Sequence, residues 1–96
     1  MKNCCINLEN INLEGITLTD ELYKREEEDK ELADALLSYL YDPIESNREH
    51  LLEETCDNIQ VLLSVLKMLE IDIPEIAEYW NTKHLEKIKE RPRKED

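Results

Sequence analysis

Residues 50–72 read HLLEETCDNIQVLLSVLKMLEID, and this stretch sets the architecture of the chain. Apolar residues recur in it at helical spacing, so we expect a helix that begins near Ser46 and continues to about Glu70. Ser46 and Glu49 match a capping box, in which each side chain satisfies a free backbone N–H of the first turn. The apolar side chains fall on more than one face of this helix: Ile59, Val61, Leu62, Leu63, Val65, Leu66, Met68 and Leu69.

A helix that is apolar nearly all round must be buried nearly all round. Two neighbouring helices of a 96-residue chain cannot cover it, whereas a second subunit can. We therefore expect an obligate homodimer, or a homotetramer made of two such dimers. In the dimer, two helical hairpins would form a four-helix bundle.

Two more helices flank this one in the expected all-α fold, so that a helical hairpin is followed by a third helix. The first begins near Thr19, whose hydroxyl can cap it, and ends at Asp42-Pro43, because the residue before a proline is pushed out of the α region. The third opens at Pro74 and is stopped by Pro92. The expected organisation is an apolar N-terminal arm over residues 1–18, a helical domain over 19–92 and a charged tail over 93–96.

The composition is strongly acidic, with 24 Asp and Glu against 12 Lys and Arg, a net charge of −12 and a pI near 4.5. A basic patch for nucleic acid is therefore not expected, because phosphates would be repelled. No apolar run approaches the roughly 18 residues that span a bilayer, and the N-terminus does not read as a signal peptide, so we expect a cytoplasmic protein without a membrane partner. The 3 cysteines form no CxxC pair and are expected to be free thiols.

Two acidic signatures lie on the two hairpin helices. Residues 27–31 read EEDKE and residues 53–57 read EETCD. Within each signature, two acids stand three residues apart and share a helical face: Glu28 with Glu31, and Glu54 with Asp57. If the helices pack as a hairpin, four carboxylates converge, and a hard cation such as Mg²⁺, with Mn²⁺ as a substitute, relieves their repulsion. A solvated, charged helix face would produce a similar pattern.

The combination of these signatures resembles the MazG-like all-α nucleoside triphosphate pyrophosphohydrolases. That family is marked by EExxE, a spacer that closes a helical hairpin, and ExxD. Here 22 residues separate Glu31 from Glu54, and the final segment IPEIAEYWNTKHLEKIKERP is similar to the family's C-terminal helix. The resemblance covers roughly residues 22–92.

The resemblance implies a Mg²⁺-dependent enzyme that cleaves a (deoxy)nucleoside triphosphate to a monophosphate and pyrophosphate. It implies metal binding by Glu28, Glu31, Glu54 and Asp57. It also implies that Glu27 and Glu53 either surround the metal site without binding the ion directly or assist catalysis by orienting the attacking water. The residues that it places on the nucleotide are Asn81, Lys83, Lys87 and Arg91.

A different class of function also fits the composition. An acidic helical protein can act without catalysis, by binding a basic partner or by mimicking nucleic acid to inhibit an enzyme. The two hypotheses differ in where the acids point. Converging carboxylates favour the enzyme, and an outward surface of one sign favours the mimic.

Overall fold

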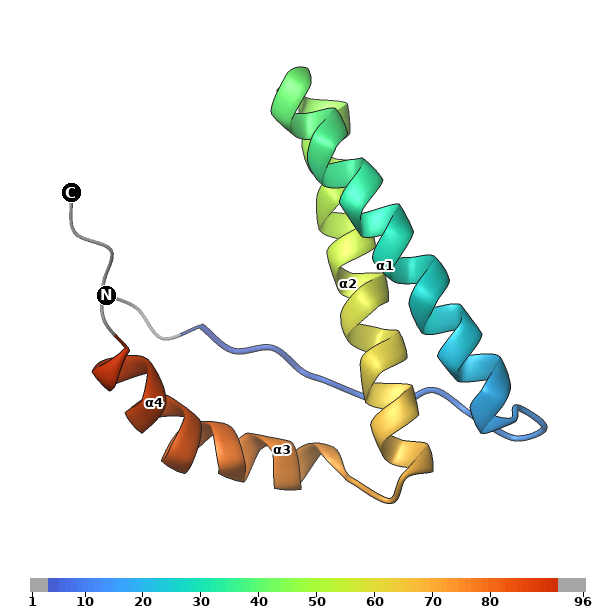
Figure 1. Cartoon of the computed structure of the whole chain (residues 1–96), viewed down its shortest axis with the longest axis vertical. Coiled ribbons are helices and arrows are strands. Elements are labelled where there is room, and N and C mark those ends of the chain that lie inside the picture. Colours follow the sequence, from blue (N-terminus) through green and yellow to red (C-terminus); the bar gives the residue numbers. More distant parts are fainter. Residues whose placement is uncertain (1–3, 92–96) are drawn as a thin grey trace.

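The computed structural model describes residues 4–91, which contain helices and no strand (Figure 1). Helices α1 (Leu18–Tyr41) and α2 (Glu45–Met68) form an antiparallel hairpin. They are followed by α3 (Ile73–Tyr79), a π-helical turn η1 (Trp80–His84) and α4 (Leu85–Glu90). The all-α class and the order of the helices are as expected from the sequence.

The first helix starts at Leu18, which is earlier than a cap at Thr19 would place its first residue. Thr17 is the N-cap, its hydroxyl accepts a hydrogen bond from the Asp20 N–H, and the Asp20 carboxylate accepts one from the Thr17 N–H. The expectation of a Thr19 cap was therefore wrong, because the residue that completes the box stands three after Thr17. The helix ends before Asp42-Pro43, as predicted.

The second helix lacks the predicted capping box. It begins at Glu45 with Ile44 as N-cap and without a side-chain cap, so Ser46 already lies within the helix. Asn47 instead turns back toward the preceding helix, where its Nδ2 donates to the Asp42 carbonyl at 2.9 Å and to the Ser38 carbonyl at 3.4 Å. The first turn of α2 thus directs a side-chain donor to the C-terminus of α1.

The end of α2 lies two residues before the expected Glu70. Glu70 adopts a left-handed backbone with φ 65°. Its N–H donates to the Lys67 carbonyl and the Ile71 N–H to the Leu66 carbonyl, both at 2.9 Å. These two bonds form a Schellman motif, in which a non-glycine residue takes the position that glycine normally fills.

The third helix is continuous from Ile73 to Glu90 but widens in its middle. Pro74 lies in its first turn, as predicted. The backbone stays right-handed helical at Trp80 and at Leu85, so α3, η1 and α4 join without a break. The predicted stop at Pro92 and the charged tail lie outside the described residues.

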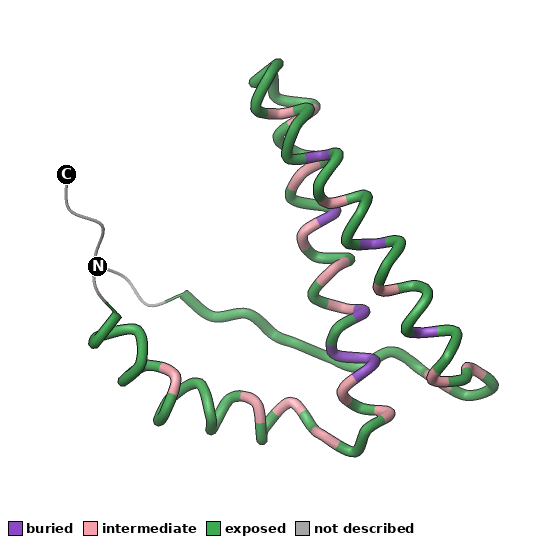
Figure 2. Tube along the Cα trace, viewed as in Figure 1, coloured by how far each residue is buried: buried purple, intermediate pink, exposed green. Residues whose placement is uncertain are grey.

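Burial is concentrated where the two long helices face each other (Figure 2). The buried apolar residues are Ala35, Val61, Leu63 and Val65, and Ser64 is fully enclosed, with its hydroxyl donating to the Gln60 carbonyl at 3.1 Å. Among the described residues, α3, η1 and α4 contain no buried side chain. A single chain therefore has a thin core, and much of its apolar surface remains exposed.

The arm that precedes α1 passes alongside α2 (Figure 1). Residues 6–9 line a hollow together with Cys56, Ile59, Gln60 and Leu63 of α2. A turn at Gly15, with φ 80°, then leads the chain into α1. None of the helices in the described part of the chain has the length and apolar character needed to cross a membrane.

Candidate metal centre

Three of the predicted metal ligands come together between the two long helices. Glu28 of α1 and Glu54 and Asp57 of α2 each offer a carboxylate oxygen, and these oxygens lie within 4.8 Å of one another. Glu28 is 5% exposed and Glu54 is 8% exposed, whereas Asp57 is open to solvent. The cluster thus has an enclosed side and an open side.

The helical periodicity explains why these acids face inward. Glu28 stands in line with Ala35, and Asp57 stands in line with Val61 and Val65, all of which are buried in the hairpin. Burial of the apolar residues therefore brings the carboxylates toward the seam between the helices, although an ionised carboxylate is costly to remove from water. Packing of the apolar part thus holds the acids together.

Two carboxylate oxygens in this cluster have no partner. Glu28 Oε1 and Glu54 Oε1 are buried and make no hydrogen bond within the described residues. A buried polar atom without a partner typically costs about 1–3 kcal/mol, and more when it is charged. These two oxygens come from different helices and belong to two of the three residues whose carboxylates come together. A cation placed among them would satisfy both.

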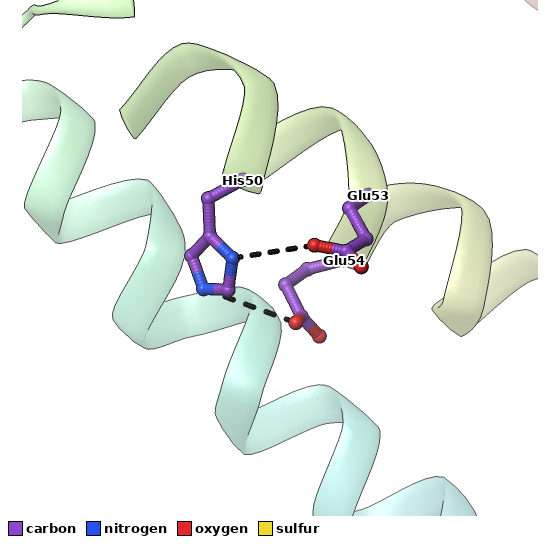
Figure 3. A group of neighbouring side chains, drawn as sticks. All are labelled: His50, Glu53 and Glu54. Carbon is purple, nitrogen blue, oxygen red and sulfur yellow. Dashed lines mark ion pairs between the residues drawn. The ribbon is translucent and has the colours of Figure 1, made fainter. Parts of the chain in front are cut away.

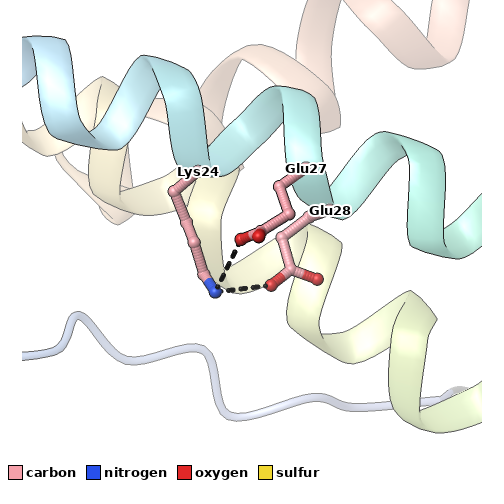
Figure 4. A network of polar contacts seen from close by, with 3 residues as sticks. All are labelled: Lys24, Glu27 and Glu28. Carbon is pink, nitrogen blue, oxygen red and sulfur yellow. Dashed lines mark hydrogen bonds and ion pairs between the residues drawn. The ribbon is translucent and has the colours of Figure 1, made fainter.

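Lys24 already neutralises part of the charge (Figure 4). Its Nζ lies 3.1 Å from Glu28 Oε2 and 3.3 Å from Glu27 Oε1. The hydrogen bond to Glu28, and then the one to Glu27, raises the pKa of Lys24, so the ammonium form is favoured. Lys24 and Glu28 stand at i,i+4 spacing on α1, so this pair lies within one helix and borders the candidate centre.

Glu31, the fourth predicted ligand, is exposed and lies outside the group of three. The acids of the cluster nevertheless change its pKa. Loss of hydration, followed by the negative charges of Glu28, Glu54 and Glu27, raises the pKa of Glu31. Its carboxylate is therefore placed on the open side, where repulsion from the other acids disfavours its charged form.

A hydrogen bond between the helices lies next to the acids. Asn58 Nδ2 donates to Asp29 Oδ1 at 2.9 Å, and Asp29 Oδ2 also accepts from Arg25 at 2.7 Å. These residues are the immediate neighbours of Asp57 and Glu28 in sequence. The pair was not anticipated from the sequence, because the register between two helices cannot be read from either helix alone.

The two residues predicted to assist catalysis sit at the exposed rim. The Glu27 side chain is 59% exposed and is held by Lys24, and the Glu53 side chain is 68% exposed. Glu53 lies beside His50, which the sequence reasoning did not assign to a site (Figure 3). The spacing H-x-x-E-E in residues 50–54 was the available signal for this side chain.

The residues predicted to bind the nucleotide lie elsewhere in a single chain. Asn81 and Lys83 are on η1, Lys87 is on α4, and Arg91 follows α4. This segment extends away from the hairpin (Figure 1), so one chain does not bring these side chains to the carboxylates. Beside them lies an apolar hollow between the end of α2 and the third helix, lined by Leu66, Ile71, Glu75, Ile76, Tyr79, Trp80 and His84.

Comparison of the chain with protein-family models, with curated proteins and with solved structures found no match. The functional argument therefore rests on the chemistry of the residues described above.

Proposed function

We propose that this protein is a Mg²⁺-dependent nucleotide pyrophosphohydrolase that cleaves a (deoxy)nucleoside triphosphate to the monophosphate and pyrophosphate. The observation that supports the proposal is the pair of buried, unpartnered oxygens, Glu28 Oε1 and Glu54 Oε1, within one cluster of carboxylates. Nucleotide house-cleaning, the removal of unwanted nucleotides, is the role that such an activity would serve.

The donor set suits a hard divalent cation. Mg²⁺ prefers oxygen ligands and is usually bound by one or two carboxylates, water and substrate phosphates. Glu28, Glu54 and Asp57 would hold it, and Glu31 would join from the open side, where the cation would relieve the repulsion that raises the pKa of Glu31. Mn²⁺ fits the same oxygen set.

When bound, the metal would polarise the phosphoryl oxygens and offset the charge of the triphosphate, which a protein of net charge −12 would otherwise repel. The chain's own residues would do the rest. Glu27 and Glu53 stand at the exposed rim, where either carboxylate can orient a water molecule and accept its proton. The enclosed side of the cluster would limit access of bulk water to the acids.

The proposed enzyme is a homodimer or homotetramer. A stripe of apolar residues on α2 is exposed in one chain, including Ile59, Leu62 and Leu69 at 39%, 40% and 52%. A second hairpin packed on this stripe would complete a four-helix bundle. It would also supply a route by which Asn81, Lys83, Lys87 and Arg91 of one subunit reach the carboxylates of another.

A phosphate-release screen tests the proposal. The full chain is incubated with Mg²⁺ and a panel of ribo- and deoxynucleoside triphosphates, with and without added pyrophosphatase. We expect phosphate only when pyrophosphatase is present, because the released product is pyrophosphate. Asp57→Asn should abolish the signal, and Asp34→Asn, an exposed acid outside the cluster, should leave it unchanged.

The screen also addresses the alternative of an acidic interaction protein. The burial of Glu28 and Glu54 weighs against a purely outward acidic surface. A panel without turnover, together with unchanged melting in Mg²⁺, would instead favour the non-catalytic protein that binds a basic partner.

A further inference from the structure

A second group of candidate metal ligands lies within one turn of α2, and it contains an imidazole. His50, Glu53 and Glu54 each offer one ligand atom, and these atoms lie within 4.8 Å of one another (Figure 3). The spacing of three and four residues places all three side chains on one face of the helix. The group is therefore present in each chain, whatever its assembly.

The distances do not suit direct hydrogen bonds. His50 Nδ1 lies 3.6 Å from Glu53 Oε1, and His50 Nε2 lies 3.8 Å from Glu54 Oε2, both longer than a hydrogen bond. Adjacent ligands of a metal ion with bonds of about 2.1 Å lie roughly 3.0 to 3.4 Å apart. One imidazole gives a single nitrogen to a given cation, so Glu53 and Glu54 would both approach the same nitrogen. The three ligand atoms lie within 4.8 Å of one another and would have to move closer together to reach such distances.

Glu54 links this group to the other carboxylate cluster. It is 8% exposed, one of its oxygens faces His50, and its other oxygen is buried without a partner. A carboxylate has two oxygens and can therefore serve two cations at once. Paired metal ions in enzymes commonly lie about 3.5–4 Å apart, which is within reach of a shared carboxylate.

We propose that His50, Glu53 and Glu54 form a second divalent-cation site that takes a transition metal ion, with Glu54 shared between it and the Glu28–Asp57 cluster. Imidazole favours ions such as Co²⁺, Ni²⁺ and Zn²⁺, whereas Mg²⁺ prefers a set of oxygens. The two sites are therefore chemically distinct. The proposal shares Glu54 with the proposed Mg²⁺ centre, but it does not rest on triphosphate hydrolysis.

Calorimetric titration of the full chain with Ni²⁺, in a background of millimolar Mg²⁺, tests this site. His50→Gln should weaken Ni²⁺ binding at least about tenfold, since even the loss of a residue that only supports a ligand costs that much. Mg²⁺ affinity, measured separately, should change less than about twofold. His84→Gln is the matched control, because it removes the other histidine of the chain, and it should leave Ni²⁺ binding unchanged.

Asp57→Asn separates the two proposals, because it removes a ligand from the Mg²⁺ centre alone. It should abolish Mg²⁺ binding and retain Ni²⁺ binding. A variant that loses Mg²⁺ binding but keeps Ni²⁺ binding supports two separate sites. A wild-type protein that binds Ni²⁺ through His50 but does not bind Mg²⁺ would overturn the proposed enzyme and leave the second site supported.

The absorption spectrum of the Co²⁺-loaded protein distinguishes binding at His50 from binding by the exposed thiols Cys4, Cys5 and Cys56. Co²⁺ bound at His50 should give no thiolate-to-cobalt charge-transfer band. The proposal is overturned if that band accounts for the bound metal, if His50→Gln binds Ni²⁺ as the wild type does, or if His84→Gln causes the same loss. The metal-free melting temperature of His50→Gln should match that of the wild type, because His50 is exposed and makes no hydrogen bond with Glu53 or Glu54.

Discussion

Asn58 donates a hydrogen bond across the hairpin to Asp29, with 2.9 Å between Nδ2 and Oδ1. The two residues adjoin Asp57 and Glu28, so this bond fixes the relative position of the two helices at the carboxylate cluster. A site made of side chains from two helices needs such a contact, since small shifts between the helices would separate its ligands.

Asn58→Ala should therefore weaken both the fold and the metal site. Loss of one hydrogen bond should lower the free energy of unfolding by about 0.5–1.5 kcal/mol, because the contact is exposed to solvent. The stabilisation by Mg²⁺ should fall as well, because Glu28 and Asp57 are held less firmly. Denaturant titrations with and without Mg²⁺ measure both effects. Asn12→Ala, which removes a hydrogen bond to the Glu14 N–H in the arm, should leave the Mg²⁺ effect intact.

Millimolar Mg²⁺ or Mn²⁺ should raise the melting temperature of the wild-type protein. Binding to the folded state alone adds about 2.7 kcal/mol of stability at a hundred times the dissociation constant. Asp57→Asn should abolish the increase and leave the metal-free fold intact or slightly more stable, because one charge leaves a crowded set. If Asp57→Asn unfolds the protein instead, the acids are structural ion-pair partners and the metal assignment is wrong.

Lys24→Gln should tighten metal binding. The ammonium group lies 3.1 Å from Glu28 Oε2 and repels a cation placed beside that carboxylate. Its removal should raise Mg²⁺ affinity on the order of tenfold, or about 1.4 kcal/mol, and should destabilise the metal-free protein, because Glu28 loses its partner. Lys67→Gln provides the comparison, since Lys67 pairs with Asp72 at 2.7 Å near the other end of α2. Equal effects of the two variants on affinity would mean that only the net charge of the protein matters.

The pH dependence of stability should reveal Glu31. Its pKa is raised in the folded protein by loss of hydration and by Glu28, Glu54 and Glu27. The folded state therefore holds this proton more tightly than the unfolded chain does. The resulting stability is fully present below the ordinary value of 4.5 and is lost as the pH rises through the folded pKa.

Thermal melts from below pH 4.5 to pH 7, without divalent ions, measure the effect. Glu31→Gln should flatten the loss of stability and should be more stable than the wild type at pH 7. Glu26→Gln removes one charge from an exposed position on the same helix and should preserve the wild-type slope. If Glu31 is a ligand, as proposed, saturating Mg²⁺ should stabilise the wild type more than it stabilises Glu31→Gln. If Glu31 is not a ligand, saturating Mg²⁺ should make the two proteins equally stable.

The sequence predicted the parts of the fold that depend on periodicity. The inward positions of Ala35, Val61 and Val65 follow from helical spacing, and the same spacing brought Glu28 and Glu54 to the seam. The helix boundaries depended on which of several neighbouring residues takes the N-cap position. The pattern T-x-x-D at Thr17 competes with Thr19 for the cap of α1 and forms it, and the Ser46 box is absent because the backbone is already helical at Glu45.

Features that depend on the approach of two helices were not readable in this way. The Asn58–Asp29 bond requires the register between α1 and α2, and the burial of Glu28, with which Lys24 pairs, depends on which acids the hairpin encloses. The π-helical turn at Trp80–His84, which carries the predicted nucleotide ligands Asn81 and Lys83, likewise has no periodic signal in the sequence. Such widened turns often occur at functional sites.

The last prediction concerns assembly. On α2, Ile59, Leu62 and Leu69 follow one another at helical spacing, and each is between 39% and 52% exposed in a single chain. Burying this stripe against a second hairpin would gain roughly 25 cal/mol for each Å² of apolar surface removed from water. We therefore expect a homodimer whose dissociation and unfolding coincide, so that the melting temperature rises with protein concentration.

Leu62→Gln should shift the protein toward an unstable monomer in sedimentation equilibrium, whereas Tyr41→Ser, at an 81% exposed position at the hairpin end, should not. A stable, folded wild-type monomer at micromolar concentration would refute the dimer, and it would leave the proposed nucleotide ligands on η1 and α4 without a route to the carboxylates.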